Sequence, residues 1–104
     1  MGLFNRRPNM DEGVQMYRGT EGAVLVDVRD PDEYALGHVP GSVNLPLSAI
    51  RDAEDVLPDY DAPLFVYCLS GGRSAQAVAK LVEMGYTAVT NIGGISTYHG
   101  EVER

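Results

Sequence analysis

Cys68 is the only cysteine in the chain, and it stands where an apolar segment meets a loop that contains two glycines. Residues 64–67 precede it, Gly71 and Gly72 follow, and a helical pattern begins at Ser74. The unpaired N–H groups of such a loop and of the first helical turn carry partial positive charge, which favours thiolate over thiol. We therefore expect the chemistry to begin with the sulfur anion of Cys68.

The loop after the cysteine is predicted to hold an anion. Gly71 and Gly72 can both adopt positive φ and expose their amides, and the residues before them can add further N–H donors. Arg73 would supply a cation at the rim or bond back to the loop carbonyls. These features predict a pKa of Cys68 one or more units below its usual value of about 8.5. The predicted site comprises catalytic Cys68 and the loop residues Leu69, Ser70, Gly71, Gly72, Arg73 and Ser74.

A purely structural role for Cys68 is the first alternative, because free cysteines are often buried as small hydrophobic residues. A packing cysteine, however, needs neither the glycine pair nor the arginine that follow it. The run Gly-Gly-Arg-Ser before a helix therefore favours the catalytic interpretation.

A thiolate in such a loop could attack phosphorus, a disulfide or a sulfane sulfur. In cysteine phosphatases a histidine precedes the cysteine, and the arginine lies one position further from the cysteine than Arg73 does here. In this chain Tyr67 precedes Cys68, and Arg73 closes a shorter loop. A shorter loop encloses a smaller anion site, which suits a single sulfur atom better than a phosphoryl group with three oxygens. Thiol–disulfide exchange normally uses a second, resolving cysteine, and the chain has none. Sulfur transfer fits best.

The composition excludes several other classes of function. With 104 residues, 44% of them hydrophobic, the chain predicts one globular domain, and its formal charge of −7 disfavours nucleic acid and anionic membranes as partners. No apolar run is long enough to span a membrane, and we expect a cytoplasmic protein whose thiol stays reduced. His38 and His99 are too distant from each other in the sequence to suggest a metal site, so we expect neither metal nor cofactor.

Strand and helix patterns alternate along the chain. We expect residues 1–10 to form an N-terminal arm or short edge strand, and residues 11–104 to form the domain. Strands are predicted at 23–28, 43–45, 64–67 and 87–92, and helices at 11–17, from 30 for under two turns, at 48–53 and at 74–84. In the last helix we expect residues 75, 78, 79 and 82 to face the core.

This alternation predicts an α/β domain with a mostly parallel sheet, helices on both faces and right-handed crossovers. Sites in such sheets gather at the carboxyl ends of the strands. Asp27 and Cys68 both fall near that edge, and we expect Asp27 and Arg29 to support the site, most simply as a structural ion pair.

Five segments together resemble the rhodanese family of sulfurtransferases, specifically its single-domain members. They are residues 25–29, 33–34, 37–46, the loop 68–74 and 91–95, in the family's order and spacing. The resemblance implies a doubly wound sheet and a persulfide carried on Cys68. It also implies two half-reactions: the thiolate takes sulfur from a donor such as thiosulfate, expelling sulfite, and a thiophilic acceptor such as cyanide or a thiol removes it.

Two features differ from the family's usual pattern. Tyr98 stands where tryptophan is frequent, and we expect its ring to pack over the domain while its hydroxyl finds a partner. Arg73 is the only basic side chain of the loop, so a protein-bound persulfide is as suitable a donor as the thiosulfate dianion. We expect a small sulfur donor and acceptor, or a sulfur-carrying protein, as partners of a monomer or weak homodimer. The remaining alternatives are a non-catalytic interaction module and a cysteine phosphatase or arsenate reductase.

Overall fold

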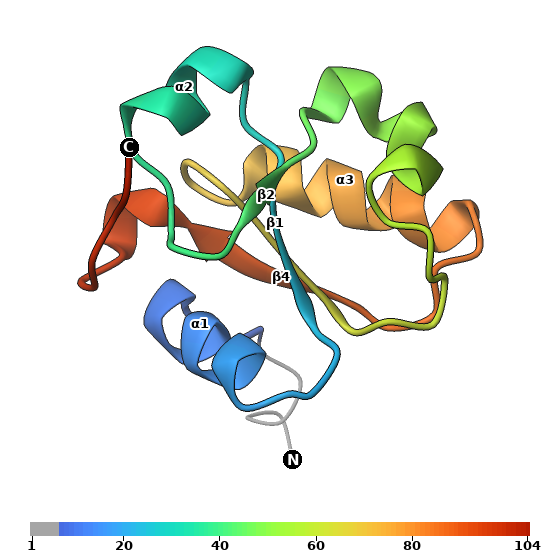
Figure 1. The fold of residues 1–104 in the computed structure, drawn as a ribbon, viewed down its shortest axis with the longest axis horizontal. Coiled ribbons are helices and arrows are strands. Elements are labelled where there is room, and N and C mark those ends of the chain that lie inside the picture. The colour runs from blue at the N-terminus through green and yellow to red at the C-terminus, as the bar shows by residue number, and fades with distance from the viewer. Residues whose placement is uncertain (1–6) are drawn as a thin grey trace.

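The computed structural model describes residues 7–104 and arranges them as a small α/β domain (Figure 1). Four strands carry the fold: β1 (Val24–Asp27), β2 (Val43–Asn44), β3 (Leu64–Cys68) and β4 (Val89–Gly94). The helical elements are α1 (Met10–Arg18), α2 (Pro31–Leu36), the 3-10 segment η2 (Leu47–Asp55), α3 (Gly72–Glu83) and the short 3-10 turn η3 (Ile95–Thr97).

The sheet is parallel throughout, with the strand order β2-β1-β3-β4. The strands β1 and β3 lie in the middle and are almost completely buried, which explains their unbroken apolar sequences. In the register of this pair Asp27 lies opposite Tyr67, so the carboxyl ends of both strands reach the same edge. The predicted fold class is confirmed, and Cys68 lies at the predicted edge.

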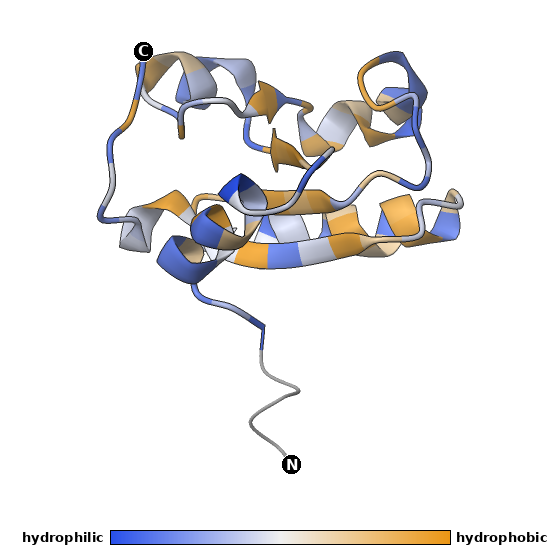
Figure 2. Cartoon of the chain, turned by 60° about the horizontal axis from the view of Figure 1, so that its bottom comes forward, coloured by the Kyte–Doolittle hydropathy of each residue, from blue (hydrophilic) through white to orange (hydrophobic). Residues whose placement is uncertain are grey.

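Helices cover both faces of the sheet. Alternate strand residues face opposite sides, and they divide the core in two. On one face α3 and η2 pack over Val26, Val66 and Cys68, and on the other α1 packs over Leu25, Tyr67 and Ile92, as the contacts of the two core clusters show. In Figure 2 the strands are coloured as hydrophobic along most of their length, whereas α1 is mostly hydrophilic. The cysteine thus belongs to the α3 side of the sheet.

The helix-start signals around residue 30 are confirmed. The backbone N–H of Asp30 donates to a carboxylate oxygen of Glu33 at 3.0 Å, Pro31 occupies the first helical position, and Gly37 follows the last helical residue. This short helix places Glu33 beside the catalytic loop, as described below.

Of the predicted core face of α3, only Val78 packs against the core, and it is partly buried. The residues that the helix buries are Ser74, Ala77 and Leu81, whereas the side chain of Val82 is 55% exposed. Apolar spacing favoured a stripe rotated by one position around the helix, because it took account of apolar side chains only and left out Ser74 with its hydroxyl. That hydroxyl is fully buried because it has partners inside the loop.

The N-terminal arm or edge strand predicted over residues 1–10 falls partly outside the described residues. Residues 7–9 are irregular, and Met10 already begins α1, capped by the side chain of Asn9, which accepts from the N–H of Glu12 at 2.9 Å. The irregular segment passes close to the loop after β3 and brings Arg7 to it. Among residues 7–104 there is no helix with the length and apolar character needed to cross a membrane.

Candidate active site

Cys68 ends β3 and leads into a tight loop that turns directly into α3. Its thiol is free, and the residue is 1% exposed. Gly71 has φ 110° in the left-handed region, which favours glycine, and Gly72 begins the helix. The sequence allowed positive φ at both glycines and predicted that the helix begins at Ser74. The earlier start places the helix N-terminus two residues nearer to the sulfur.

The sulfur of Cys68 has close polar contacts with this turn. The N–H of Gly71 donates to Sγ at 3.0 Å, and the hydroxyl oxygen of Ser74 lies 3.4 Å from it. Burial alone would raise the pKa of Cys68, but the Ser74 hydroxyl and the amides of Ser74, Gly71 and Ser70 outweigh it, so the pKa lies below its ordinary value. The site therefore favours the thiolate more than an isolated cysteine would.

Ser74 connects the sulfur to β4 through a buried polar network. Its hydroxyl lies 2.8 Å from Oδ1 of Asn91 and 3.0 Å from the carbonyl oxygen of Gly71. The same Oδ1 also accepts from the N–H of Gly93 at 2.9 Å. Asn91 thus orients Ser74, a role that sequence reasoning did not assign. The only available signal was an amide side chain inside an otherwise apolar strand.

Arg73 braces the loop against α2. Its two terminal nitrogens bond both carboxylate oxygens of Glu33, at 2.6 and 2.9 Å. This guanidinium holds the pKa of Glu33 far below its usual value, at about 2. The sequence left Arg73 open between a cation at the rim and a brace bonded to loop carbonyls. The structure shows a brace, although its partner is a carboxylate from another element.

The supporting residues Asp27 and Arg29 form the buried ion pair that was predicted. The guanidinium of Arg29 donates to the Asp27 carboxylate at distances from 2.7 to 3.1 Å and also to the carbonyl oxygen of Gly37 at 2.7 Å. Asn44 in β2 donates to the carbonyl oxygens of both residues. The pair therefore fixes the segment between β1 and α2, and it forms no hydrogen bond with the sulfur of Cys68.

The end of β4 closes against the loop at very short range. A Cβ atom added to Gly94 would overlap the carbonyl group of Leu69, and the N–H of Ser96 donates to that carbonyl oxygen at 3.0 Å. The Leu69 side chain itself is exposed. Further along, Tyr98 packs against the core on the α1 side, and its hydroxyl lies 3.5 Å from a guanidinium nitrogen of Arg18. The expected packing of this ring, and the expected partner for its hydroxyl, are both found.

The two histidines lie apart from the sulfur. His38 stacks on Tyr34, with 3.7 Å between the ring centroids, and its Nδ1 lies 2.8 Å from the Tyr34 carbonyl oxygen. His99 pairs with Asp11 at 2.6 Å. Within residues 7–104 there is no group of three or more His, Cys, Asp or Glu side chains that could hold a metal ion.

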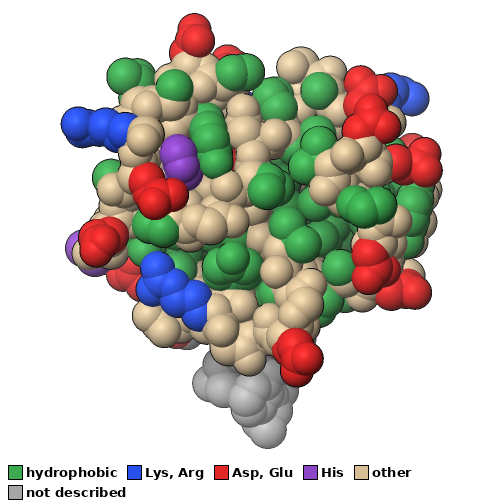
Figure 3. Space-filling view, in the orientation of Figure 1, with side chains coloured by type: hydrophobic (Ala, Val, Ile, Leu, Met, Phe, Trp, Pro, Cys, Tyr) green, Lys and Arg blue, Asp and Glu red, His purple; other side chains and the backbone are tan. Residues whose placement is uncertain are grey.

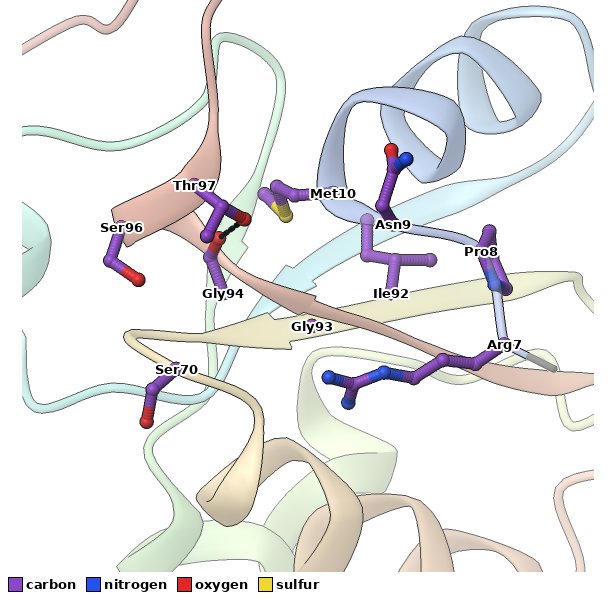
Figure 4. A pocket seen from close by; sticks show the side chains of 10 residues that line it. All are labelled: Arg7, Pro8, Asn9, Met10, Ser70, Ile92, Gly93, Gly94, Ser96 and Thr97. Carbon is purple, nitrogen blue, oxygen red and sulfur yellow. Dashed lines mark hydrogen bonds between the residues drawn. The ribbon is translucent and has the colours of Figure 1, made fainter.

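A pocket of about 330 Å³ opens beside the loop, between the start of α1 and the end of β4 (Figure 4). Ser70, Gly93 and Thr97 line it, and the side chain of Arg7 points across it toward Ser70. Sequence reasoning did not assign Arg7 to the site. A local pattern could not have found it, because only the path of the chain before α1 brings this guanidinium to the loop.

Comparison with known proteins agrees with this geometry. Residues 10–101 match the family model described as Rhodanese-like domain. The thiosulfate sulfurtransferase GlpE of Pseudomonas fluorescens is 43% identical over 94 residues, covering 90% of this chain and 83% of that protein. The thiosulfate sulfurtransferase PspE of Escherichia coli is 42% identical over 71 residues, covering 67% and 68%. A solved structure described as rhodanese with anions from E. coli has a TM-score of 0.73 and 36% identity, covering 79% of this chain and 98% of that one.

The family match covers most of the chain, and it agrees with the parallel sheet and with the cysteine loop at the carboxyl edge of that sheet. The chain is thus a sulfurtransferase that belongs to the rhodanese-like domain family.

Proposed function

We propose that Cys68 carries sulfur as a persulfide between a sulfane donor and a thiophilic acceptor. The observation that supports this most is the set of polar groups at its sulfur, namely the Gly71 amide and the Ser74 hydroxyl, together with the lowered pKa. A lowered pKa raises the fraction of thiolate, and a thiolate attacks the outer sulfur of a donor without the help of a general base.

In the first half-reaction the Cys68 thiolate forms a bond to the outer sulfur of thiosulfate. The S–S bond of the donor breaks, and sulfite leaves with the electron pair. The product is a Cys68 persulfide whose terminal sulfur bears the negative charge. The loop amides that faced the thiolate then face this terminal sulfur and stabilise it.

In the second half-reaction an acceptor attacks the terminal sulfur. Cyanide gives thiocyanate, and a thiolate gives a new persulfide, while the electron pair of the breaking S–S bond returns to Cys68 as thiolate. The donor and acceptor are thus used in turn at one sulfur atom, so the kinetics are ping-pong.

Phosphoryl transfer is less well supported by the same loop. A phosphatase needs a free guanidinium to clasp the equatorial oxygens of the transferred group. Here both terminal nitrogens of Arg73 are bonded to the Glu33 carboxylate. The proposed substrates are therefore thiosulfate or another sulfane donor, including a protein-bound persulfide, and a small or protein-borne thiophilic acceptor.

The test is a steady-state assay in which thiosulfate and cyanide are varied and thiocyanate is measured. We expect parallel double-reciprocal plots for the parent and no turnover above background for Cys68→Ser. Equal turnover in Cys68→Ser would contradict the proposal, as would the absence of turnover with both thiosulfate and an organic persulfide in a protein whose thiol is reactive. We further propose a cytoplasmic location, where the thiol stays reduced, and a monomer or weak homodimer.

A further inference from the structure

The guanidinium of Arg7 lies directly against the loop that holds the nucleophile. A Cβ atom added to Gly71 would lie 2.8 Å from Nη1 of Arg7, and one added to Gly93 would lie 3.7 Å from its Nη2. Gly71 is also the residue whose N–H donates to the sulfur of Cys68. Gly71 is therefore close to both the guanidinium and the sulfur.

Arg7 differs from the other arginines near the site because no described residue pairs with it. Arg29 and Arg73 are each bonded to a carboxylate, whereas Arg7 forms no hydrogen bond or ion pair with any residue in the described range 7–104. Among the described residues that line the pocket beside the loop, it is also the only charged one. In a chain of net charge −7, whose acidic side chains are scattered around the face seen in Figure 3, this pocket is locally positive.

The rest of the pocket wall suits an oxyanion. The hydroxyls of Ser70 and Ser96 face solvent and form no hydrogen bond with residues 7–104, so both can donate to a ligand. Gly93 also lines this wall, where a Cβ atom would point toward the guanidinium of Arg7. A planar cation with several N–H donors next to free hydroxyls is the kind of arrangement that binds sulfonate-type groups.

We propose that Arg7 and this pocket bind the oxyanion end of the sulfur donor, so that the enzyme recognises donors of the thiosulfate class. The inference rests on the function proposed above and adds the residue that selects the donor. In thiosulfate the oxygens lie one S–S bond and one S–O bond beyond the sulfur that Cys68 attacks. A donor approaching over Gly71 would place them toward Arg7. When the S–S bond breaks, the electron pair stays on sulfite, and the guanidinium offsets the charge that this leaving group gains.

Arg7→Gln and Arg51→Gln form a matched pair for the test, because each removes one positive charge. Arg51 is exposed on η2 and does not line the pocket. We expect Arg7→Gln to raise the KM for thiosulfate about tenfold, with the inhibition constant of sulfite rising in parallel. The KM for the persulfide of N-acetylcysteamine, whose leaving group carries no oxyanion, should change less than about twofold. Arg51→Gln should leave all three constants close to those of the parent.

A binding measurement separates this inference from the function on which it rests. In the reduced parent, titration with sodium sulfate should shift the amide resonances of Ser70, Gly93 and Gly94, and sodium chloride at matched ionic strength should not. The sulfate shifts should be lost in Arg7→Gln and kept in Arg51→Gln. If thiosulfate never loads Cys68, the proposed function fails, yet this titration still decides whether the anion site exists.

Three results would overturn the assignment of Arg7. One is an equal rise in the KM for thiosulfate in Arg7→Gln and Arg51→Gln, which would show a general effect of net charge. Another is a sulfate titration that leaves the pocket amides unshifted in the parent. The third is an equally large rise in the KM for the N-acetylcysteamine persulfide in Arg7→Gln, because that donor offers the guanidinium no oxyanion.

Discussion

Replacing Ser74 with alanine should shift the titration of the nucleophile without unfolding the protein. The Ser74 hydroxyl lies 3.4 Å from the sulfur of Cys68 and contributes the largest lowering of its pKa. A hydrogen bond to a charged group contributes about 1.5–3 kcal/mol, and one pKa unit corresponds to about 1.36 kcal/mol. Ser74→Ala should therefore raise the pKa of Cys68 enough to be resolved in a titration.

The structural cost of this change should be small, because the polar atoms that Ser74 contacts keep other partners. Oδ1 of Asn91 still accepts from the Gly93 amide, and the Gly71 carbonyl oxygen still accepts from the Ala75 N–H at 3.1 Å. We expect a loss of about 1 kcal/mol in the free energy of unfolding, the typical net contribution of one hydrogen bond. A folded variant can then be compared with the parent.

The assay is the rate of alkylation by iodoacetamide as a function of pH. Because only the thiolate reacts, a higher pKa moves the midpoint of the profile to higher pH. Ser70→Ala is the matched control: it removes an exposed hydroxyl but keeps the Ser70 amide, which is the part of this residue that lowers the pKa of Cys68. Superimposable profiles for parent, Ser74→Ala and Ser70→Ala would refute the assignment of Ser74 as a donor to the thiolate.

Three further predictions concern the residues that hold the loop in place. Gly71→Ala should lower the free energy of unfolding by about 1–2 kcal/mol and slow sulfur loading, because an L-residue is strained at φ 110°. Gly72→Ala should change neither quantity, because an added Cβ there meets nothing within 4 Å; chemical denaturation and loading assays compare the two variants. Glu33→Gln should lower the free energy of unfolding by about 1 kcal/mol at neutral pH, because it breaks the ion pair with Arg73. Because the pKa of Glu33 is lowered from 4.5 to about 2, this difference should be complete above about pH 4.5 and vanish as the pH falls through about 2; a constant difference would exclude the ion pair as its cause. Asp27→Asn should lower the free energy of unfolding by about 3–5 kcal/mol, since it leaves the buried Arg29 guanidinium without its counter-charge. Thermal or chemical unfolding measures this loss, and an unchanged free energy of unfolding would contradict the buried pair.

The features that the sequence predicts well are local ones. The apolar run before Cys68 and the glycine after it indicate a strand, a tight turn and a helix without knowledge of the rest of the fold. The acid and proline at residues 30 and 31 likewise define a helix start. Strand alternation with helices then predicts a parallel sheet, which brings Asp27 and Cys68 to one edge.

The features that the sequence does not predict are contacts between distant segments. Arg73 could have faced the substrate, and only the position of α2 shows that Glu33 binds it. Ser74 was assigned to the loop but not to the buried face of the helix, because hydropathy ignores a buried hydroxyl that has partners. Its partner Asn91 comes from another strand. Arg7 falls within the predicted N-terminal arm or edge strand, so nothing in its neighbourhood along the chain connects it with the cysteine.

The most direct test of persulfide transfer is the mass of the peptide that contains Cys68. The reduced protein is incubated with thiosulfate, digested without reductant and analysed before and after treatment with cyanide. We predict one added sulfur atom on this peptide, lost on cyanide treatment with the formation of thiocyanate, and no addition in Cys68→Ser. A Cys68 peptide that stays unmodified with thiosulfate and with an organic persulfide, while the same thiol reacts with iodoacetamide, would contradict the account.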